Sequence, residues 1–186
     1  MAEEKKQDTN QQDQQDQQNN SVILTNKKKP ISNVLQDKWT IWAHDTQDPS
    51  WDIESYKSIY EFTTIEEFWV FFNNIKHFRD FMLFVMRGDT LPIYEDDMCK
   101  NGGYYSYVVP TPQLSNSIIL LLTRMIGETL TDVETYDEVV GMSVSPKGNR
   151  SVIKIWNKNK EEHLSFYHKD RYFTGGNCRY VPHRKD

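Results

Sequence analysis

The chain has 186 residues, of which 37% are hydrophobic, 13% aromatic and 26% charged, and its formal net charge is −5. This length predicts one domain with an appendage and argues against a solenoid or a two-domain enzyme. The negative charge argues against a protein that coats duplex nucleic acid by releasing counterions. No apolar stretch approaches the roughly 20 residues that span a bilayer, so no membrane association is expected.

Two cysteines and the absence of an apolar N-terminal run predict neither a disulfide framework nor a secretory signal, so we expect a cytoplasmic protein. The low mean hydropathy of −0.75 has its origin in the first residues, which read MAEEKKQDTNQQDQQDQQNN. So polar a segment cannot offset the entropy that ordering it would cost. We predict a disordered Gln/Asn/Asp-rich tail over residues 1–30 and a folded domain over residues 31–186.

In the first half of the domain, alternating polarity predicts strands over Lys38–His44 and Ser58–Thr63. Thr64 and Glu67 have the spacing of a capping box and predict that a helix begins there. The apolar side chains of this helix cover a wider arc than one sheet contact needs, so part of the arc is expected to be exposed. They are Ile65, Phe68, Trp69, Phe71, Phe72 and Ile75.

In the second half, Thr111 and Pro112 predict the start of another apolar helix, with proline at the favoured first position. Residues 146–150 predict the loop of a hairpin. Because strands and helices are mixed without strict alternation, we expect an α+β domain with an antiparallel sheet and helices on one face. The further predicted strands are Thr90–Glu95, Tyr104–Val109, Val139–Ser145 and Ser151–Trp156.

Motifs for catalysis are nearly absent from the sequence. The five histidines show no zinc-ligand spacing, and neither cysteine belongs to a CxxC pair. The chain also lacks a phosphate-binding GxxxxGK[ST] loop and a GxSxG nucleophile elbow. No catalytic residue, metal ligand or cofactor is therefore predicted.

A set of short segments carries a stronger signal through its order and its tryptophans. The segments are LQDKWTIW (35–42), DPSW (48–51), TTIEEFW (63–69), IYEDD (93–97), NGG (101–103), MIGE (125–128) and IKIWN (153–157). Together they resemble eukaryotic translation initiation factor 4E, the messenger-RNA cap-binding family, over about residues 34–156. The resemblance implies a curved antiparallel β-sheet with helices packed on its convex face and the cap site on the concave side.

The same resemblance implies which residues bind the cap base. Trp51 and Tyr94 would stack on 7-methylguanine, which is cationic and therefore favours electron-rich aromatic faces. Most family members have tryptophan in place of Tyr94, and tyrosine stacks more weakly. Glu95 matches the carboxylate that accepts hydrogen bonds from the N1–H and N2–H₂ groups of guanine. Trp156 matches the tryptophan beside the methyl group, although core packing at a strand end would explain it as well.

Phosphate binding departs from the family pattern. Ser145 and Tyr104 stand where the family usually has arginines. The resemblance implies that Lys147 contacts the phosphates, that Arg150 swings in from a lengthened loop, and that Lys154 is a weaker candidate. The tail after Trp156 is also short, and by comparison with the family we expect it to lack the last helix.

On the convex face the resemblance implies a surface for a partner helix that carries a tyrosine and a leucine. A tryptophan on a helix is usually a core residue, but the wide apolar arc favours exposure of Trp69 and hence an interface. The matched positions are Val34, Ile65, Trp69 and Ile119 or Leu120.

These observations predict a monomeric, non-enzymatic protein that binds the 7-methylguanosine triphosphate end of capped mRNA and links it to an initiation scaffold protein or a repressor peptide. Two alternatives stay open: a repressor-type cap-binding paralogue, and a protein-interaction module that has lost cap binding. A cap-cleaving hydrolase is a third and weaker alternative, because such chemistry normally requires a metal-binding acidic cluster.

Overall fold

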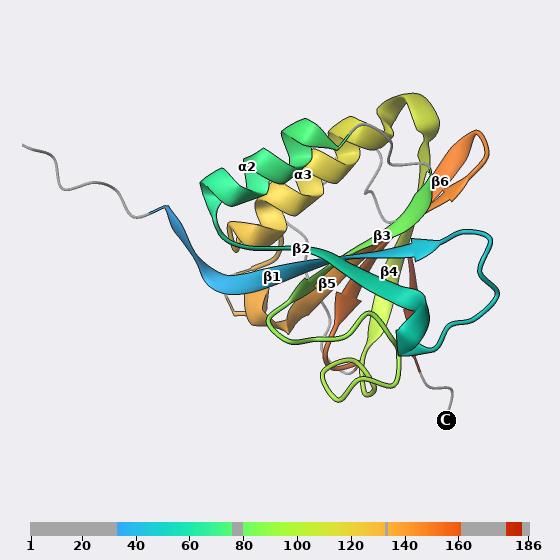
Figure 1. The fold of residues 1–186 in the computed structure, drawn as a ribbon. Coiled ribbons are helices and arrows are strands. Elements are labelled where there is room, and N and C mark those ends of the chain that lie inside the picture. The colour runs from blue at the N-terminus through green and yellow to red at the C-terminus, as the bar shows by residue number, and fades with distance from the viewer. Residues whose placement is uncertain (1–32, 76–79, 133, 161–177, 184–186) are drawn as a thin grey trace, which may run out of the picture. The chain divides into compact units, whose positions relative to one another are not determined.

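The computed structural model describes residues 33–75, 80–132, 134–160 and 178–183, which belong to the unit Asn33–Asp186 (Figure 1). The tail predicted over residues 1–30 lies outside these ranges. So does most of the C-terminal part that was predicted to be shortened. Within them, no helix is long and apolar enough to cross a membrane.

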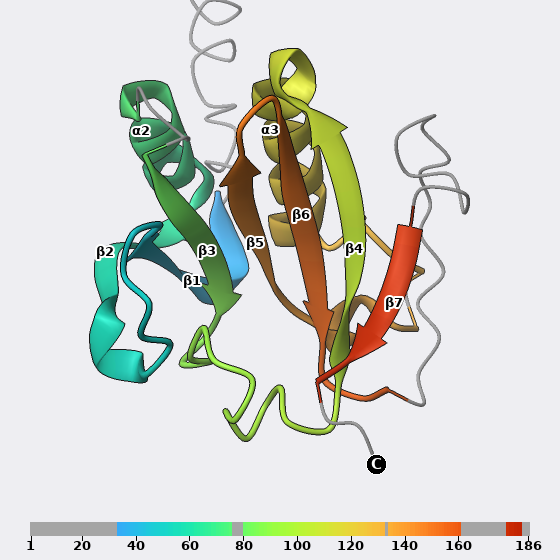
Figure 2. The ribbon, with the colours of Figure 1, turned by 90° about the vertical axis from the view of Figure 1, so that its right-hand side faces the viewer.

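Seven strands form one open sheet in the spatial order β2-β1-β3-β5-β6-β4-β7, and each paired strand is antiparallel to its neighbour (Figure 2). The α+β class with a curved antiparallel sheet is thereby confirmed. The strands are β1 (Val34–Asp45), β2 (Tyr56–Thr64), β3 (Phe81–Arg87), β4 (Gly103–Pro110), β5 (Val139–Lys147), β6 (Arg150–Asn157) and β7 (Cys178–Pro182).

Two α-helices of the described chain, α2 (Ile65–Asn74) and α3 (Leu114–Ile126), cover one face of the sheet (Figure 1). The predicted capping box is present at the start of α2. Thr64 Oγ1 accepts from the backbone N–H of Glu67 at 3.2 Å, and the Glu67 carboxylate accepts from the Thr64 N–H at 3.1 Å. Short 3-10 turns complete the elements: η1 (Ile53–Ser55), η2 (Thr111–Gln113) and η3 (Tyr136–Glu138).

Alternation along the strands divides the apolar side chains between two clusters. On β3, Leu83 and Val85 belong to the main core under the helices, whereas Phe84 belongs to a second cluster on the opposite, concave face. On β6 the same division separates Ile155 from Trp156. The helices therefore cover one face of the sheet. The side chains on the opposite face pack against the sheet and one another, and in the described part of the chain that face has no helix over it that would block a ligand.

The strand predicted over Thr90–Glu95 is wrong, because these residues form turns in the loop between β3 and β4. The Asp96 carboxylate accepts from the backbone N–H groups of Leu91 at 3.2 Å and Met98 at 2.8 Å, a local alternative to strand pairing. The neighbouring strand β3 was missed because its sequence, FMLFVMR, is apolar on both faces and shows no alternation.

The predicted hairpin is present, but its loop is shorter than expected. Lys147 pairs with Arg150, so β5 and β6 continue to a two-residue turn of Gly148 and Asn149. Gly148 has a φ of +65°, which a residue without a Cβ adopts at little cost. Pro112 also differs from expectation, since it lies in the 3-10 turn η2 ahead of α3.

Candidate ligand site and partner face

A cavity of about 430 Å³ opens on the concave face, opposite the helices. Strands β3, β5 and β6 form its floor, and the loops that follow β1 and β3 contribute its walls. The predicted site residues that line it are Trp51, Tyr94, Glu95, Lys147, Lys154 and Trp156. The other lining residues are Met82, Phe84, Ser143, Ser145 and Val152.

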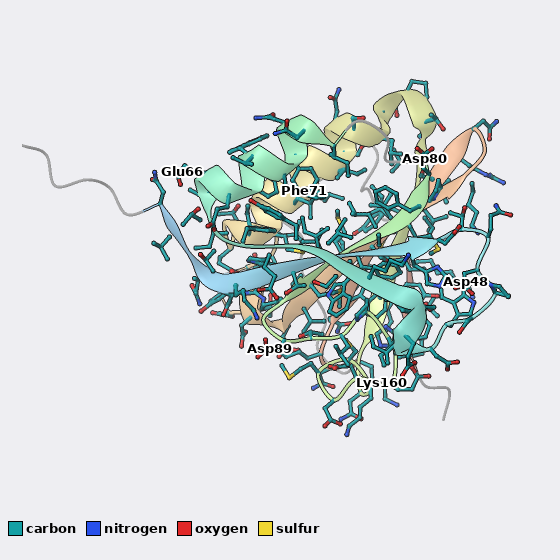
Figure 3. All side chains as sticks on the ribbon, viewed as in Figure 1. Asp48, Glu66, Phe71, Asp80, Asp89 and Lys160 are labelled. Atoms are coloured by element: carbon teal, nitrogen blue, oxygen red, sulfur yellow. The ribbon has the colours of Figure 1, made fainter. Side chains whose placement is uncertain are left out.

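Trp51 supplies one wall from the loop between β1 and η1. The Asp48 carboxylate, labelled in Figure 3, accepts from the backbone N–H of Ser50 at 2.9 Å and shapes this loop. One face of the indole stacks on His44, with ring centroids 4.6 Å apart and planes 3° from parallel. His44 is itself buried and donates from Nε2 to the Ser50 carbonyl oxygen at 2.8 Å. Because Trp51 is 55% exposed, its other face is free to stack on a ligand.

Tyr94 comes from the loop between β3 and β4, and its ring packs in an aromatic cluster. Its centroid lies 5.0 Å from that of Trp156 and 4.7 Å from that of His183. Burial, followed by the negative charge of Glu95, raises the pKa of Tyr94, so the phenol stays protonated at neutral pH. Trp51 and Tyr94 line the same cavity, and among the described residues their rings are not in contact with each other. A flat group can bind between two rings only if they are separated in this way.

His183 is a member of this cluster that sequence reasoning missed. Its Nδ1–H donates to the Cys99 carbonyl oxygen at 2.8 Å, while Nε2 is buried and has no partner among the described residues. Burial lowers the pKa of His183, which favours the neutral imidazole. No local pattern reveals this residue, because only the pairing of β7 with β4 carries it to Tyr94.

Glu95 is exposed at the cavity, and its carboxylate has no hydrogen bond or ion pair to any residue that the structure describes. Both oxygens are therefore available to a ligand with two adjacent donors. Trp156 is a core residue that also borders the cavity. It is 1% exposed within the second cluster, its Nε1 donates to Ser143 Oγ at 3.0 Å, and it still lines the cavity.

The three predicted phosphate ligands lie at different places. Lys147 is exposed at the end of β5 and lines the cavity. Arg150 is also exposed, but it belongs to β6 and not to a flexible loop, and it lies outside the lining of the cavity. The expectation that Arg150 lies in a long loop and swings toward the phosphates is therefore wrong, because strand pairing holds its backbone beside Lys147.

Lys154 is half-buried on β6 and engages two tyrosines. Its Nζ donates to Tyr94 Oη at 2.9 Å and lies 4.2 Å from the centroid of the Tyr104 ring. Burial lowers the pKa of Lys154. This contact depends on two strands and a loop, so it was not predicted.

The predicted partner face presents exposed apolar groups around the start of α2. Val34 is paired with Thr64, which places it next to the first turn of the helix. There Asn33 also donates from Nδ2 to the side chain of Glu66, labelled in Figure 3. The exposed fractions are 66% for Val34, 44% for Ile65, 36% for Trp69 and 56% for Val70, while Ile119 and Leu120 on α3 are half-buried. Val70 was not predicted.

Comparison with known sequences gives one family. A model described as eukaryotic initiation factor 4E matches residues 34–169. Eukaryotic translation initiation factor 4E-1 of Prunus domestica is 33% identical over 143 residues, which are 70% of this chain and 59% of that protein. The protein of the same name from Arabidopsis thaliana is 33% identical over 140 residues, or 70% and 57% of the two chains. The chain thus spans less than two thirds of these relatives.

Solved structures give the same fold. A complex of C. elegans eIF4E-3 with the 4E-binding protein Mextli and a cap analog matches with a TM-score of 0.69 and 20% identity, covering 82% of this chain and 94% of that one. Ascaris suum eIF4E-3 with an m2,2,7G cap matches with a TM-score of 0.68 and 18% identity, covering 84% and 94%. At these identities the likeness establishes the fold alone.

Proposed function

Because the chain belongs to the eukaryotic initiation factor 4E family, we propose that it binds the 7-methylguanosine cap of mRNA and links it to a translation initiation scaffold protein. The observation that carries the proposal is a single cavity lined by Trp51, Tyr94 and Glu95. The proposed role involves binding without catalysis, and it is exercised in the cytoplasm, where translation is initiated.

The two rings would hold the base between them. Trp51 is supported from behind by His44, and Tyr94 by Trp156 and His183, so neither ring requires the ligand to keep its place. Support of this kind lowers the entropy lost on binding. A cationic 7-methylguanine would gain a cation–π attraction that neutral guanine does not have.

The edge of the base would face Glu95. Guanine presents N1–H and N2–H₂ side by side, and a carboxylate offers two acceptors in one plane, so two charge-assisted hydrogen bonds form together. Adenine has no such pair of donors at this edge. Glu95 is therefore the residue proposed to select guanine.

The triphosphate would extend toward the hairpin of β5 and β6. Figure 2 shows this hairpin at the end of the sheet away from the loop that joins β3 and β4, where Tyr94 lies. Lys147 and Arg150 are cross-strand partners at that hairpin and place two positive charges together. We propose that they contact the phosphates in place of the arginines replaced by Ser145 and Tyr104.

A Trp51→Ala variant tests the base site. Loss of one stacking face should weaken binding of 7-methyl-GTP by about 1 to 3 kcal/mol, or about 5- to 150-fold in Kd. Isothermal titration calorimetry measures this without relying on the tryptophan signal that the substitution alters. Trp51→Phe keeps a stacking face and should retain most of the affinity. Unchanged binding by Trp51→Ala, or no binding of 7-methyl-GTP by the wild type, would favour an interaction module without cap binding.

A Lys147→Ala, Arg150→Ala double variant tests the phosphate site. Both side chains are exposed, so their combined loss should weaken 7-methyl-GTP binding only about 3- to 30-fold at low ionic strength. The difference from wild type should shrink as salt is added, because salt screens exposed charges. Calorimetry at two salt concentrations checks both expectations, and an unaltered affinity for the triphosphate would place the phosphates elsewhere.

A further inference from the structure

We propose that Lys154 determines how strongly this site distinguishes 7-methylguanine from guanine, by holding a positive charge against the ring on which the base stacks. The inference rests on the proposed function, because it requires the base to lie against Tyr94. It assigns Lys154 to the base, although the residue pattern had suggested the phosphates.

The contacts of Lys154 hold its charge beside the base site. The side chain leaves β6 on the concave face, between Val152 and Trp156, and all three residues line the cavity. Its ammonium donates to Tyr94 Oη at 2.9 Å and lies 5.6 Å from the centroid of that ring. The ammonium also lies over the Tyr104 ring, 4.2 Å from its centroid. The ammonium is thus held at the rim of the stacking ring.

Lys154 forms no ion pair with a carboxylate of the residues that the structure describes. Three other lysines of the described chain, Lys38, Lys100 and Lys158, each pair with a carboxylate. In the same described ranges, the ammonium of Lys154 has no carboxylate within ion-pair distance, and its partners are a phenol oxygen and an aromatic face. Both partners are neutral, so the positive charge of Lys154 acts on whatever lies on Tyr94, together with the negative charge of the neighbouring Glu95.

This charge affects the methylated base and not the unmethylated one. Two like unit charges a few ångströms apart near a protein surface repel strongly enough to change an affinity tenfold. The hydrogen bond from Lys154 also draws electron density from the Tyr94 phenol, which weakens its attraction for a cation. Neutral guanine experiences neither penalty. Because GTP and 7-methyl-GTP carry the same triphosphate, any effect of Lys154 on phosphate binding cancels in the ratio of their Kd values. Lys154 therefore lowers the methyl preference of the site.

A Lys154→Gln variant tests the inference, because glutamine is neutral and still offers a donor to Tyr94. The measured quantity is the ratio of the Kd for GTP, obtained by competition, to the Kd for 7-methyl-GTP, obtained by calorimetry. This ratio should rise about 3- to 10-fold in Lys154→Gln and in Lys154→Met. It should stay near the wild-type value in Lys154→Arg, which keeps the charge.

Lys147→Gln is the matched control, since Lys147 lines the same cavity without contacting Tyr94. It should weaken both ligands by the same factor and leave the ratio unchanged. An unchanged ratio in Lys154→Gln would overturn the inference, and equal losses for both ligands would make Lys154 a phosphate ligand. If wild type binds 7-methyl-GTP selectively, these outcomes leave the proposed function standing. If neither wild type nor variant binds 7-methyl-GTP, the proposed function fails and takes the inference with it.

Discussion

A Trp69→Ala variant is expected to lose binding of a 4E-binding peptide by at least about 2 kcal/mol, or about 30-fold in Kd, while keeping its fold and its affinity for 7-methyl-GTP. Trp69 is 36% exposed on α2, and Ile65 precedes it by one helical turn on the same stripe. Apolar surface that water reaches in the free protein contributes mainly to association when a partner covers it. Peptide binding by calorimetry and a thermal melt measure the two effects separately.

Phe68→Ala provides the contrasting control from the adjacent position. Phe68 is 0% exposed and packs in the main core, with its ring 5.1 Å from that of Trp69. Its truncation should lower the free energy of unfolding by about 3 to 5 kcal/mol through the cavity it leaves. If Trp69→Ala loses as much stability as Phe68→Ala, Trp69 acts as a core residue and the proposed partner face is wrong.

A Glu95→Ala variant should show the largest loss of guanine selectivity of any single substitution in the cavity. Hydrogen bonds to a charged acceptor contribute about 1.5 to 3 kcal/mol, and this change leaves two donors of the base without a partner. The sharpest comparison uses 7-methyl-GTP and 7-methyl-ITP, because hypoxanthine keeps N1–H and lacks the N2 amine. Wild type should prefer 7-methyl-GTP, and Glu95→Ala should bind the two ligands with nearly equal affinity.

Two further variants show whether that result comes from the hydrogen bonds of Glu95 or only from the loss of a negative charge. Glu95→Gln keeps one acceptor and places a donor against a donor of the base, so it should also lose the preference for 7-methyl-GTP. Asp97→Asn removes a neighbouring negative charge that pairs with Lys100 outside this cavity. It should bind like wild type. A Glu95 variant that still prefers 7-methyl-GTP over 7-methyl-ITP would remove Glu95 from the proposed base edge.

Local hydrogen bonds made part of the fold predictable from sequence. The capping box of Thr64 and Glu67 joins groups three residues apart, so its pattern alone marks the start of α2. Alternation revealed β1 because the two faces of this strand differ in polarity. It could not reveal β3, whose residues are apolar on both sides because the helices pack on one face and the second cluster on the other. Nor could it show that turns around Asp96 replace the strand expected at Thr90–Glu95.

The sequence by itself determined the family motifs, the exposed apolar arc of α2 and the residue types proposed to stack on a base and pair with its edge. Only the tertiary structure decided which side chains support them. Lys154 reaches Tyr94 across 60 positions of sequence, and His183 packs on the same ring from the position that follows β7, the strand at the edge of the sheet. Contacts of this kind arise from strand pairing between distant segments, which leaves no periodic or local signature in either segment.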